Sequence, residues 1–209
     1  MTILFMKRTL LASIFAFALF LVSPQPLQAS TQQAVFAGGC FWCLEHDLEG
    51  LRGVKSVGSG YTGGDLLNPS YSNHKGHQEA VSVTFDPEKI SYKKLLRVFW
   101  RNIDPLDGDG QFCDRGDSYR PVIFTLDESQ RNDAIISSEL AALELDKSIE
   151  SLKVDFQDLN KFWIAEDYHQ DFATRNNIKY KFYRYSCGRD DRLEELWGER
   201  ARSAQQWPN

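Results

Sequence analysis

Methionine is the scarcest residue in this sequence of 209 residues and occurs only at Met1 and Met6. The sequence also lacks an apolar run that could cross a bilayer, because the longest, Leu10 to Val22, has 13 residues and a membrane-spanning helix needs about 20. Basic residues are not in excess, since 24 Lys and Arg stand against 29 Asp and Glu. These absences argue against a permanent membrane anchor, and against nucleic acid or an anionic membrane as the main partner.

The first 29 residues have the three parts of a secretory signal peptide. Lys7 and Arg8 form a short basic region, the apolar run follows, and a Pro/Gln-rich stretch ends at Ala29. We therefore expect residues 1–29 to be cleaved on export to the periplasm or another exported compartment. An uncleaved segment that anchors the protein is the alternative. Cleavage would leave 22 basic residues against 29 acidic ones and a mature chain without methionine.

The mature chain shows no internal repeat, no low-complexity block and no long linker, which favours a single domain over residues 30–209. Turn-rich patches cover residues 58–69 and 104–116. Strands are predicted over residues 34–37, 81–85, 121–126 and 154–156, and helices over residues 41–48, 91–103, 127–143, 164–173 and 191–202. A basic, tyrosine-rich connection is expected over residues 179–185. Because strands and helices alternate without a dinucleotide-binding fingerprint, we expect a two-layer α+β or α/β domain with a mixed sheet.

Cys40 follows two glycines and precedes the first predicted helix, so its thiol would lie at the helix N-terminus. The positive end of a helix favours the thiolate. It contributes up to about 2 kcal/mol, and 1.36 kcal/mol corresponds to one pKa unit, so we expect the pKa of Cys40 to fall by roughly one unit from about 8.5. Most of the thiol would stay protonated at neutral pH, so substrate or neighbouring groups must complete its activation.

Cys43 lies three residues after Cys40, on the same face of the predicted helix, and its sulfur could reach a sulfenic acid or disulfide formed on Cys40. A stabilising disulfide within one helical turn is the alternative, although so short a loop removes little chain entropy. Phe41 and Trp42 between the two cysteines would offer an apolar cradle beside the nucleophile, or would simply pack in the core.

Three further windows each carry a weaker signal. Glu79 directly precedes an apolar strand, where partial desolvation would raise the pKa of its carboxyl and keep it protonated as an acid. The other candidate side chains lie in the windows 68–71, 113–120 and 165–170 and are Tyr71, Asp114, Tyr119 and His169. Taken singly, a solvated loop or helix face would explain each of them.

Together and in this order, the windows closely resemble the A-type peptide-methionine sulfoxide reductases over essentially the whole mature chain. The tetrad Gly39 to Trp42, followed by the run Gly76 to Val81, is highly specific for that family. The resemblance implies an α+β, two-layer α/β sandwich whose mixed sheet has a split βαβ, ferredoxin-like core, and a single catalytic domain without a cofactor. It also implies reduction of the S epimer of methionine sulfoxide, free or in proteins, and a thioredoxin-like reductant.

Site residues carry over position by position. The resemblance implies Cys40 as nucleophile, Glu79 as acid, Tyr71 and Tyr119 as phenols near the sulfoxide oxygen, Asp114 as a supporting carboxylate, and Phe41, Trp42 and His169 as substrate-binding residues. This division of labour suits the chemistry, because a sulfoxide needs a soft nucleophile at sulfur and a proton donor at oxygen. Attack would leave a sulfenic acid on Cys40, which a second thiol converts to a disulfide.

The identity of that second thiol stays open. Many family members have glycine at the position of Cys43 and place a recycling cysteine in a glycine-rich C-terminal tail, whereas here Cys187 precedes a charged helical segment. Cys43 and Cys187 are both candidates, with Cys43 slightly favoured by proximity. Cys113 is either a buried thiol or a late member of the relay.

Three other functions compete with sulfoxide reduction. A thioredoxin-like thiol-disulfide oxidoreductase could use Cys40 and Cys43. A structural zinc protein could use the same two cysteines with His74 and His77. A disulfide-stapled binding module would keep Cys40 permanently paired.

Overall fold

The structure, a computed structural model, describes residues 30–207, so the predicted signal peptide at residues 1–29 lies outside the described residues. The strands are β1 (Gln32–Ala37), β2 (Val54–Thr62), β3 (Gln78–Phe85), β4 (Gly110–Gln111), β5 (Asp114–Arg115), β6 (Val122–Thr125), β7 (Asp155–Asp158) and β8 (Trp163–Ile164). The α-helices are α1 (Phe41–Glu49), α2 (Tyr92–Trp100), α3 (Glu128–Glu144), α4 (Phe172–Arg175), α5 (Asn177–Ser186) and α6 (Arg189–Trp197). In the described part of the chain, no helix combines the length and the apolar character that crossing a membrane requires.

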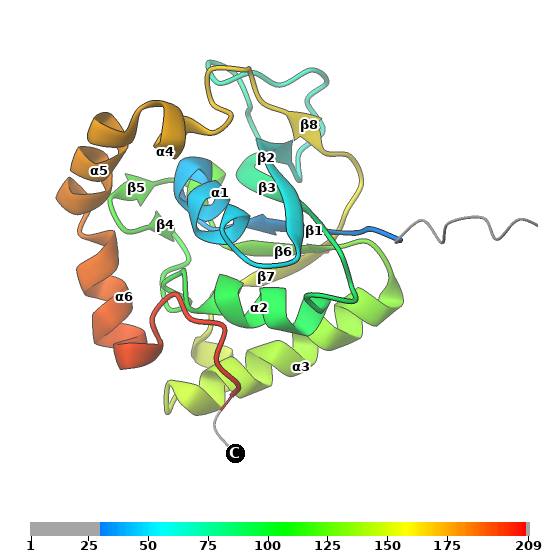
Figure 1. Ribbon diagram of the computed structural model, residues 1–209, viewed down its shortest axis with the longest axis vertical. Coiled ribbons are helices and arrows are strands. Elements are labelled where there is room, and N and C mark those ends of the chain that lie inside the picture. Colours follow the sequence, from blue (N-terminus) through cyan, green and yellow to red (C-terminus); the bar gives the residue numbers. More distant parts are fainter. Residues whose placement is uncertain (1–29, 208–209) are drawn as a thin grey trace, which may run out of the picture.

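The main sheet has six strands in the order β7-β6-β1-β3-β2-β8. Neighbouring strands in this sheet pair antiparallel, except that β6 and β7 pair in parallel, so the sheet is mixed as predicted. β1 and β2 run in the same direction on either side of β3 and are joined through α1, which makes a split βαβ unit. β3 and β6 flank β1 and are joined through α2 in the same way. The predicted ferredoxin-like core is therefore confirmed (Figure 1).

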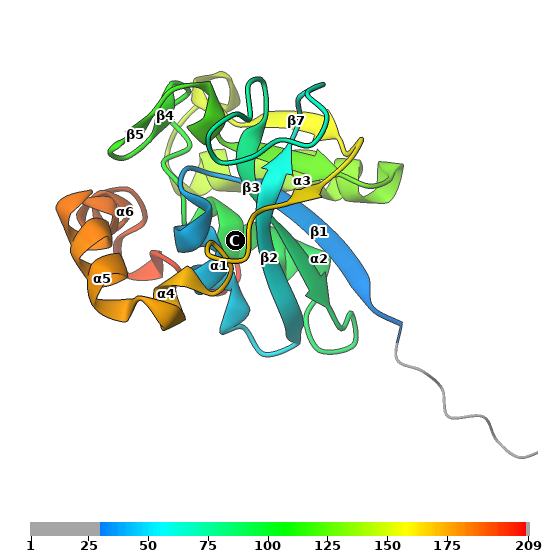
Figure 2. The same ribbon diagram turned by 90° about the horizontal axis from the view of Figure 1, so that it is seen from above.

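Alternation along the strands divides the buried side chains between the two faces of the sheet. Phe36 and Val81, which face each other across β1 and β3, join the larger core formed with α1 and α2. Val35 and Ala37 point the other way into a smaller cluster, against which Leu159 and Phe162 of the β7–β8 connection pack. Figures 1 and 2 show α5 and α6 standing beside this sandwich, next to the end of the sheet from which α1 starts.

Capping residues set the helix starts that the sequence predicts. The Ser91 side chain accepts a hydrogen bond from the backbone N–H of Lys94 at the start of α2. The Asp127 side chain accepts one from the N–H of Gln130 at the start of α3. Each cap satisfies a backbone donor that the first helical turn leaves free.

Three local predictions are wrong. Residues 164–173 are not one helix, because Ile164 ends strand β8 on the sheet edge and α4 begins only at Phe172. The expected connection over residues 179–185 is instead the middle of α5. The first part of the turn-rich patch 58–69 belongs to β2, the longest strand. Its glycine at position 60 is needed there, because a Cβ would lie 2.3 Å from the carbonyl oxygen of Trp163.

Candidate active site

Cys40 is the N-cap residue of α1, as the sequence predicts. The turn that brings the chain from β1 into α1 depends on Gly39, whose φ of +82° is disfavoured for other residues. A Cβ on Gly39 would also lie only 2.7 Å from the Cβ of Gln111. Cys40 is buried with 6% exposure, and it lines a small pocket.

This pocket brings together seven of the ten predicted site residues. Its lining consists of Cys40, Phe41, Trp42, Tyr71, Glu79, Asp114, Tyr119 and Tyr183. The pocket volume of about 50 Å³ is large enough for a small chemical group, such as the end of a side chain, but not for a bulky cofactor. A larger cleft of about 480 Å³ lies at the N-terminal ends of α2 and α3, but no cysteine or histidine lines it.

Glu79 is the buried acid of the pocket, with 2% exposure. One carboxyl oxygen, Oε2, accepts a hydrogen bond of 3.1 Å from the backbone N–H of Phe41. Burial raises the pKa of Glu79 to about 8, and the nearby Asp114 adds to the rise. The carboxyl is therefore predominantly protonated at neutral pH, when it can donate a proton into the pocket.

The thiols of Cys40 and Cys43 form a hydrogen-bonded pair. Burial raises the pKa of Cys40 well above its ordinary value, and Cys43 and Glu79 act in the same direction. The predicted lowering at Cys40 is thus wrong for the empty pocket, because desolvation outweighs the favourable helix N-terminus. Cys43 has a lowered pKa, first because the Cys40 thiol donates to its sulfur and then because Arg189 and Arg184 lie nearby.

Trp42 forms the apolar wall of the pocket and is held from three sides. Its ring stacks on Phe172 with 3.6 Å between centroids and 6° between planes. The ring of Tyr183 meets it edge-on at 5.9 Å. Its indole N–H donates a 3.1 Å hydrogen bond to Nδ1 of His169, whose pKa is lowered by burial and whose imidazole can therefore accept as the neutral form. His169 thus lies behind the wall and does not line the pocket.

The phenol side chains of Tyr71 and Tyr119 also line the pocket. Burial raises the pKa of both Tyr71 and Tyr119, and Glu79 acts next in the same direction, so both keep their protons. Glu166 fixes the first of them by accepting hydrogen bonds from the backbone N–H of Tyr71 and from the hydroxyl of Tyr61, each 3.0 Å. The polar floor of the pocket is therefore rich in proton donors.

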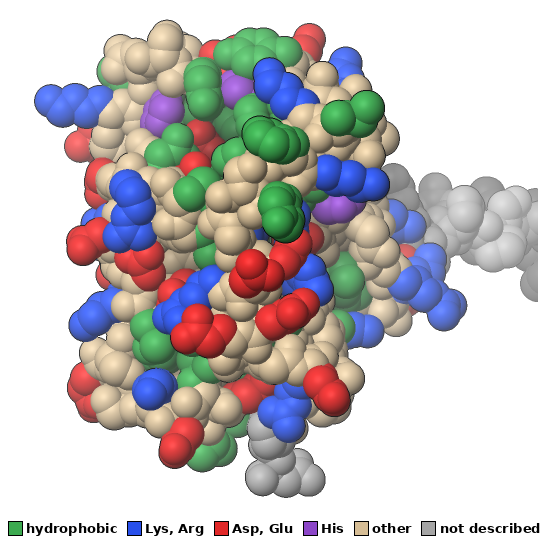
Figure 3. All heavy atoms as spheres, turned by 90° about the vertical axis from the view of Figure 1, so that its left-hand side faces the viewer, with side chains coloured by type: hydrophobic (Ala, Val, Ile, Leu, Met, Phe, Trp, Pro, Cys, Tyr) green, Lys and Arg blue, Asp and Glu red, His purple; other side chains and the backbone are tan. Residues whose placement is uncertain are grey.

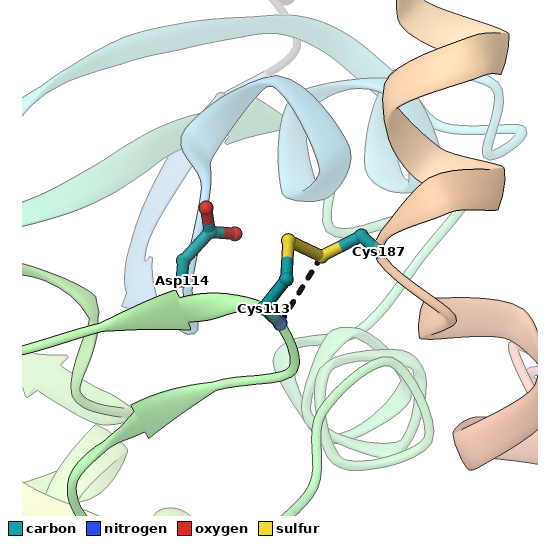
Figure 4. A group of neighbouring side chains, drawn as sticks. All are labelled: Cys113, Asp114 and Cys187. Carbon is teal, nitrogen blue, oxygen red and sulfur yellow. Dashed lines mark hydrogen bonds between the residues drawn. A yellow bond between two sulfur atoms is a disulfide. The ribbon is translucent and has the colours of Figure 1, made fainter.

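Asp114 connects the pocket to the disulfide between Cys113 and Cys187, which spans 74 positions of the sequence (Figure 4). Its carboxylate accepts hydrogen bonds from the Tyr183 hydroxyl and from the backbone N–H of Cys40. Figure 4 shows the disulfide joining the β4–β5 hairpin to the end of α5. Cys187, one of the two predicted resolving cysteines, is therefore already paired, whereas Cys40 and Cys43 are free and buried.

The alternative zinc site does not form. Both ring nitrogens of His77 are engaged in its own loop, with the N–H of Gly64 at 3.2 Å and the carbonyl of Leu66 at 2.9 Å. His74 stacks on Tyr61 at 5.0 Å. Within residues 30–207, the single group of ligand atoms close enough to share a metal is that of Cys113, Asp114 and Cys187, and its two sulfurs are bonded to each other.

Sequence reasoning missed two residues of the site. Tyr183 lies on α5, where the sequence predicts a basic, tyrosine-rich connection, and Phe172 begins α4. The spacing of Tyr180, Tyr183 and Cys187 by three and four residues is the helical signal that could have revealed the inner face of α5. Figure 3 shows acidic, basic and hydrophobic side chains mixed over this face of the molecule, and Ile178, Phe182 and Tyr185 are exposed hydrophobic residues of α5.

Known proteins are similar to this chain in sequence and in fold. The family described as "Peptide methionine sulfoxide reductase" matches residues 32–201. A "Peptide methionine sulfoxide reductase MsrA 2" of Caulobacter vibrioides is 48% identical over 192 residues, which cover 88% of this chain and 96% of that protein. Methionine sulfoxide reductase A of Corynebacterium diphtheriae has a TM-score of 0.64 at 25% identity and covers 74% of this chain and 77% of its own. Mxr1 from Saccharomyces cerevisiae in complex with Trx2 shares the fold, with a TM-score of 0.51 at 18% identity, and covers 74% of this chain and 91% of its own.

Proposed function

Because the chain belongs to the peptide methionine sulfoxide reductase family and reduces methionine sulfoxide with thiols, we propose that the Cys40 pocket is where this reaction takes place. Cys40 is the nucleophile and Glu79 the proton donor. Tyr71 and Tyr119 hold the sulfoxide oxygen, and the aromatic wall of Phe41 and Trp42 receives the methyl group. The observation that carries this assignment is the meeting of a buried thiol and a protonated carboxyl in one pocket of about 50 Å³.

The first step transfers the oxygen atom from the sulfoxide sulfur to the sulfur of Cys40. The Cys40 sulfur attacks the sulfoxide sulfur while Glu79 gives its proton to the sulfoxide oxygen. Methionine leaves, reduced by two electrons, and Cys40 keeps the oxygen as a sulfenic acid. The proton lost by the Cys40 thiol replaces the one that Glu79 gave, so atoms and charge balance. Asp114 supports the site through the N–H of Cys40 and the hydroxyl of Tyr183.

In the second step, Cys43 closes a disulfide with Cys40. Its sulfur is already hydrogen-bonded to the Cys40 thiol, and its backbone N–H donates to the carbonyl of Cys40 at 3.1 Å. Cys187 would first have to be released from Cys113. Proximity and a free thiol therefore favour Cys43 as the resolving cysteine.

A thioredoxin-like protein would then reopen the disulfide and complete the cycle. The oxidised enzyme needs a dithiol donor, since thiol-disulfide exchange consumes one pair of thiols for each disulfide. The fold relative Mxr1 was solved in complex with Trx2. We include export in the proposal: the basic and apolar pattern of residues 1–29 supports it, and N-terminal sequencing of the mature protein would test it.

The test uses pure epimers of methionine sulfoxide, free and within a peptide. The wild-type protein is expected to reduce the S epimer, and the Cys40→Ser variant to reduce neither epimer. Cys43→Ser is the matched control, because it should still release one equivalent of methionine from the first turnover. Normal turnover by Cys40→Ser would refute the assignment of the nucleophile.

A further inference from the structure

Arg189 is a buried cation beside the turn that leads into Cys40, and the steps above give it no role. It is the first residue of α6 and has 1% exposure. Its guanidinium lies 4.4 Å from the ring centroid of Phe112, and one terminal nitrogen comes within 3.5 Å of the Cβ position of Gly39, directly before Cys40. The guanidinium of Arg189 therefore packs against the turn between β1 and α1 that precedes Cys40.

Arg189 forms no direct salt bridge among the described residues, and the carboxylate of Asp114 is the acidic group that its charge stabilises from a longer distance. Its terminal nitrogen Nη2 donates a 2.6 Å hydrogen bond to the carbonyl of Asn102, while Nε has no acceptor. Arg184, the other cation near Cys43, is fully engaged, with Asp47 at 2.9 Å and Asp190 at 2.8 Å. Because a buried guanidinium without a direct ion pair is costly, a second anion that forms nearby is favoured.

We propose that Arg189 is a positioning residue for disulfide formation, whose buried guanidinium supplies the counter-charge that makes the Cys43 sulfur a thiolate. The inference rests on the proposed function, in which Cys43 resolves the Cys40 sulfenic acid. The Cys43 thiolate attacks the Cys40 sulfur, an S–S bond forms and the S–O bond breaks. The oxygen leaves with its electron pair and takes a proton from Glu79 to become water, and the proton earlier released by Cys43 restores Glu79.

The lowered pKa of Cys43, to which Arg189 contributes, agrees with this role. Other ionisable groups also face Cys43 and define the background against which a change at Arg189 must be read. These groups are Cys40 at the N-terminus of α1, Asp47 on α1, Glu79 on β3, and Tyr180, Tyr183 and Arg184 on α5. Asp114 on β5 faces Arg189 itself.

The test compares Arg189→Met, Arg189→Lys and Arg97→Met with wild-type protein. Arg97 is a matched control, because it is a buried arginine of α2 whose Nε also lacks an acceptor. Each protein receives one equivalent of methionine S-sulfoxide without reductant, across a range of pH. Mass spectrometry after quenching with a sulfenic-acid probe then follows methionine, the Cys40 sulfenic acid and the Cys40–Cys43 disulfide.

For Arg189→Met we expect methionine to form at the wild-type rate, while disulfide formation at neutral pH slows about tenfold and its pH midpoint rises by about one unit. Arg189→Lys should restore most of the rate, and Arg97→Met should leave the midpoint unchanged. The inference is overturned by an unchanged midpoint in Arg189→Met, by an equal shift in Arg189→Lys, or by a shift in Arg97→Met. Methionine formed with Cys40 paired elsewhere would overturn this inference and the choice of Cys43 as resolving cysteine, but it would leave sulfoxide reduction at Cys40 standing. No methionine from wild-type protein would remove the proposed function as a whole.

Discussion

Replacing Glu79 by Gln should make the protein more stable than wild type at neutral and higher pH but less active. In the wild-type chain, Oε2 of Glu79 accepts a 3.1 Å hydrogen bond from the backbone N–H of Phe41. Glutamine keeps an oxygen that can accept this bond, but it lacks the acidic proton that the carboxyl donates. In the folded chain the pKa of Glu79 is about 8, against an ordinary value of 4.5. Because the folded state binds this proton more tightly, the associated stability is fully present below the unfolded pKa and is lost as pH rises toward about 8.

The magnitude follows from proton linkage. Between about pH 5 and pH 8, wild-type protein should lose about 3 kcal/mol of unfolding free energy relative to Glu79→Gln. Urea denaturation of both proteins at several pH values measures this difference, in which other titrating groups cancel. Glu128→Gln, at an exposed position on α3, is the control and should track wild type.

Activity should change the other way. Loss of a general acid typically slows a reaction by about 10²- to 10⁴-fold. The rate of methionine release in the first turnover is the appropriate measurement, because it precedes disulfide formation. A stability difference that stays constant across this pH range, or a first turnover that Glu79→Gln leaves intact, would refute the role given to Glu79.

Two further perturbations address the wall and the disulfide. Phe172→Leu removes the ring that stacks on Trp42 and should raise KM about 3- to 10-fold with kcat nearly unchanged, whereas a change in kcat alone would contradict a binding role. Replacing Cys113 and Cys187 together by Ser opens a loop of 74 residues and should cost about 4 kcal/mol of unfolding free energy, seen as a lower Tm, while a first turnover lost at the same time would show that the pair takes part in the chemistry.

Much of the fold was predictable because its signals are local. Alternation over residues 81–85, the caps at Ser91 and Asp127, and the two glycines before Cys40 each act through neighbouring residues. β2 was missed because its glycines suit close packing against β8, a contact that no local pattern reveals. The helix α5 was missed because its exposed face carries Ile178, Phe182 and Tyr185, which obscure the amphipathic pattern.

At the site, the pattern predicted which side chains meet but not how they are charged. The pKa of Glu79 rises as the sequence predicts, although Glu79 is the second residue of β3 and does not precede the strand. The pKa of Cys40 does not fall as predicted, since its burial depends on packing by the distant helices α4 and α5. The pairing of Cys113 with Cys187 also arises from the tertiary structure, where α5 meets the β4–β5 hairpin.

Peptide mapping by mass spectrometry after a single turnover without reductant tests the account most directly. Wild-type protein is expected to yield one equivalent of methionine, a new disulfide between Cys40 and Cys43, and an undisturbed disulfide between Cys113 and Cys187. Recovery of Cys40 as a free thiol after methionine has formed, or its pairing with Cys187, would contradict the account.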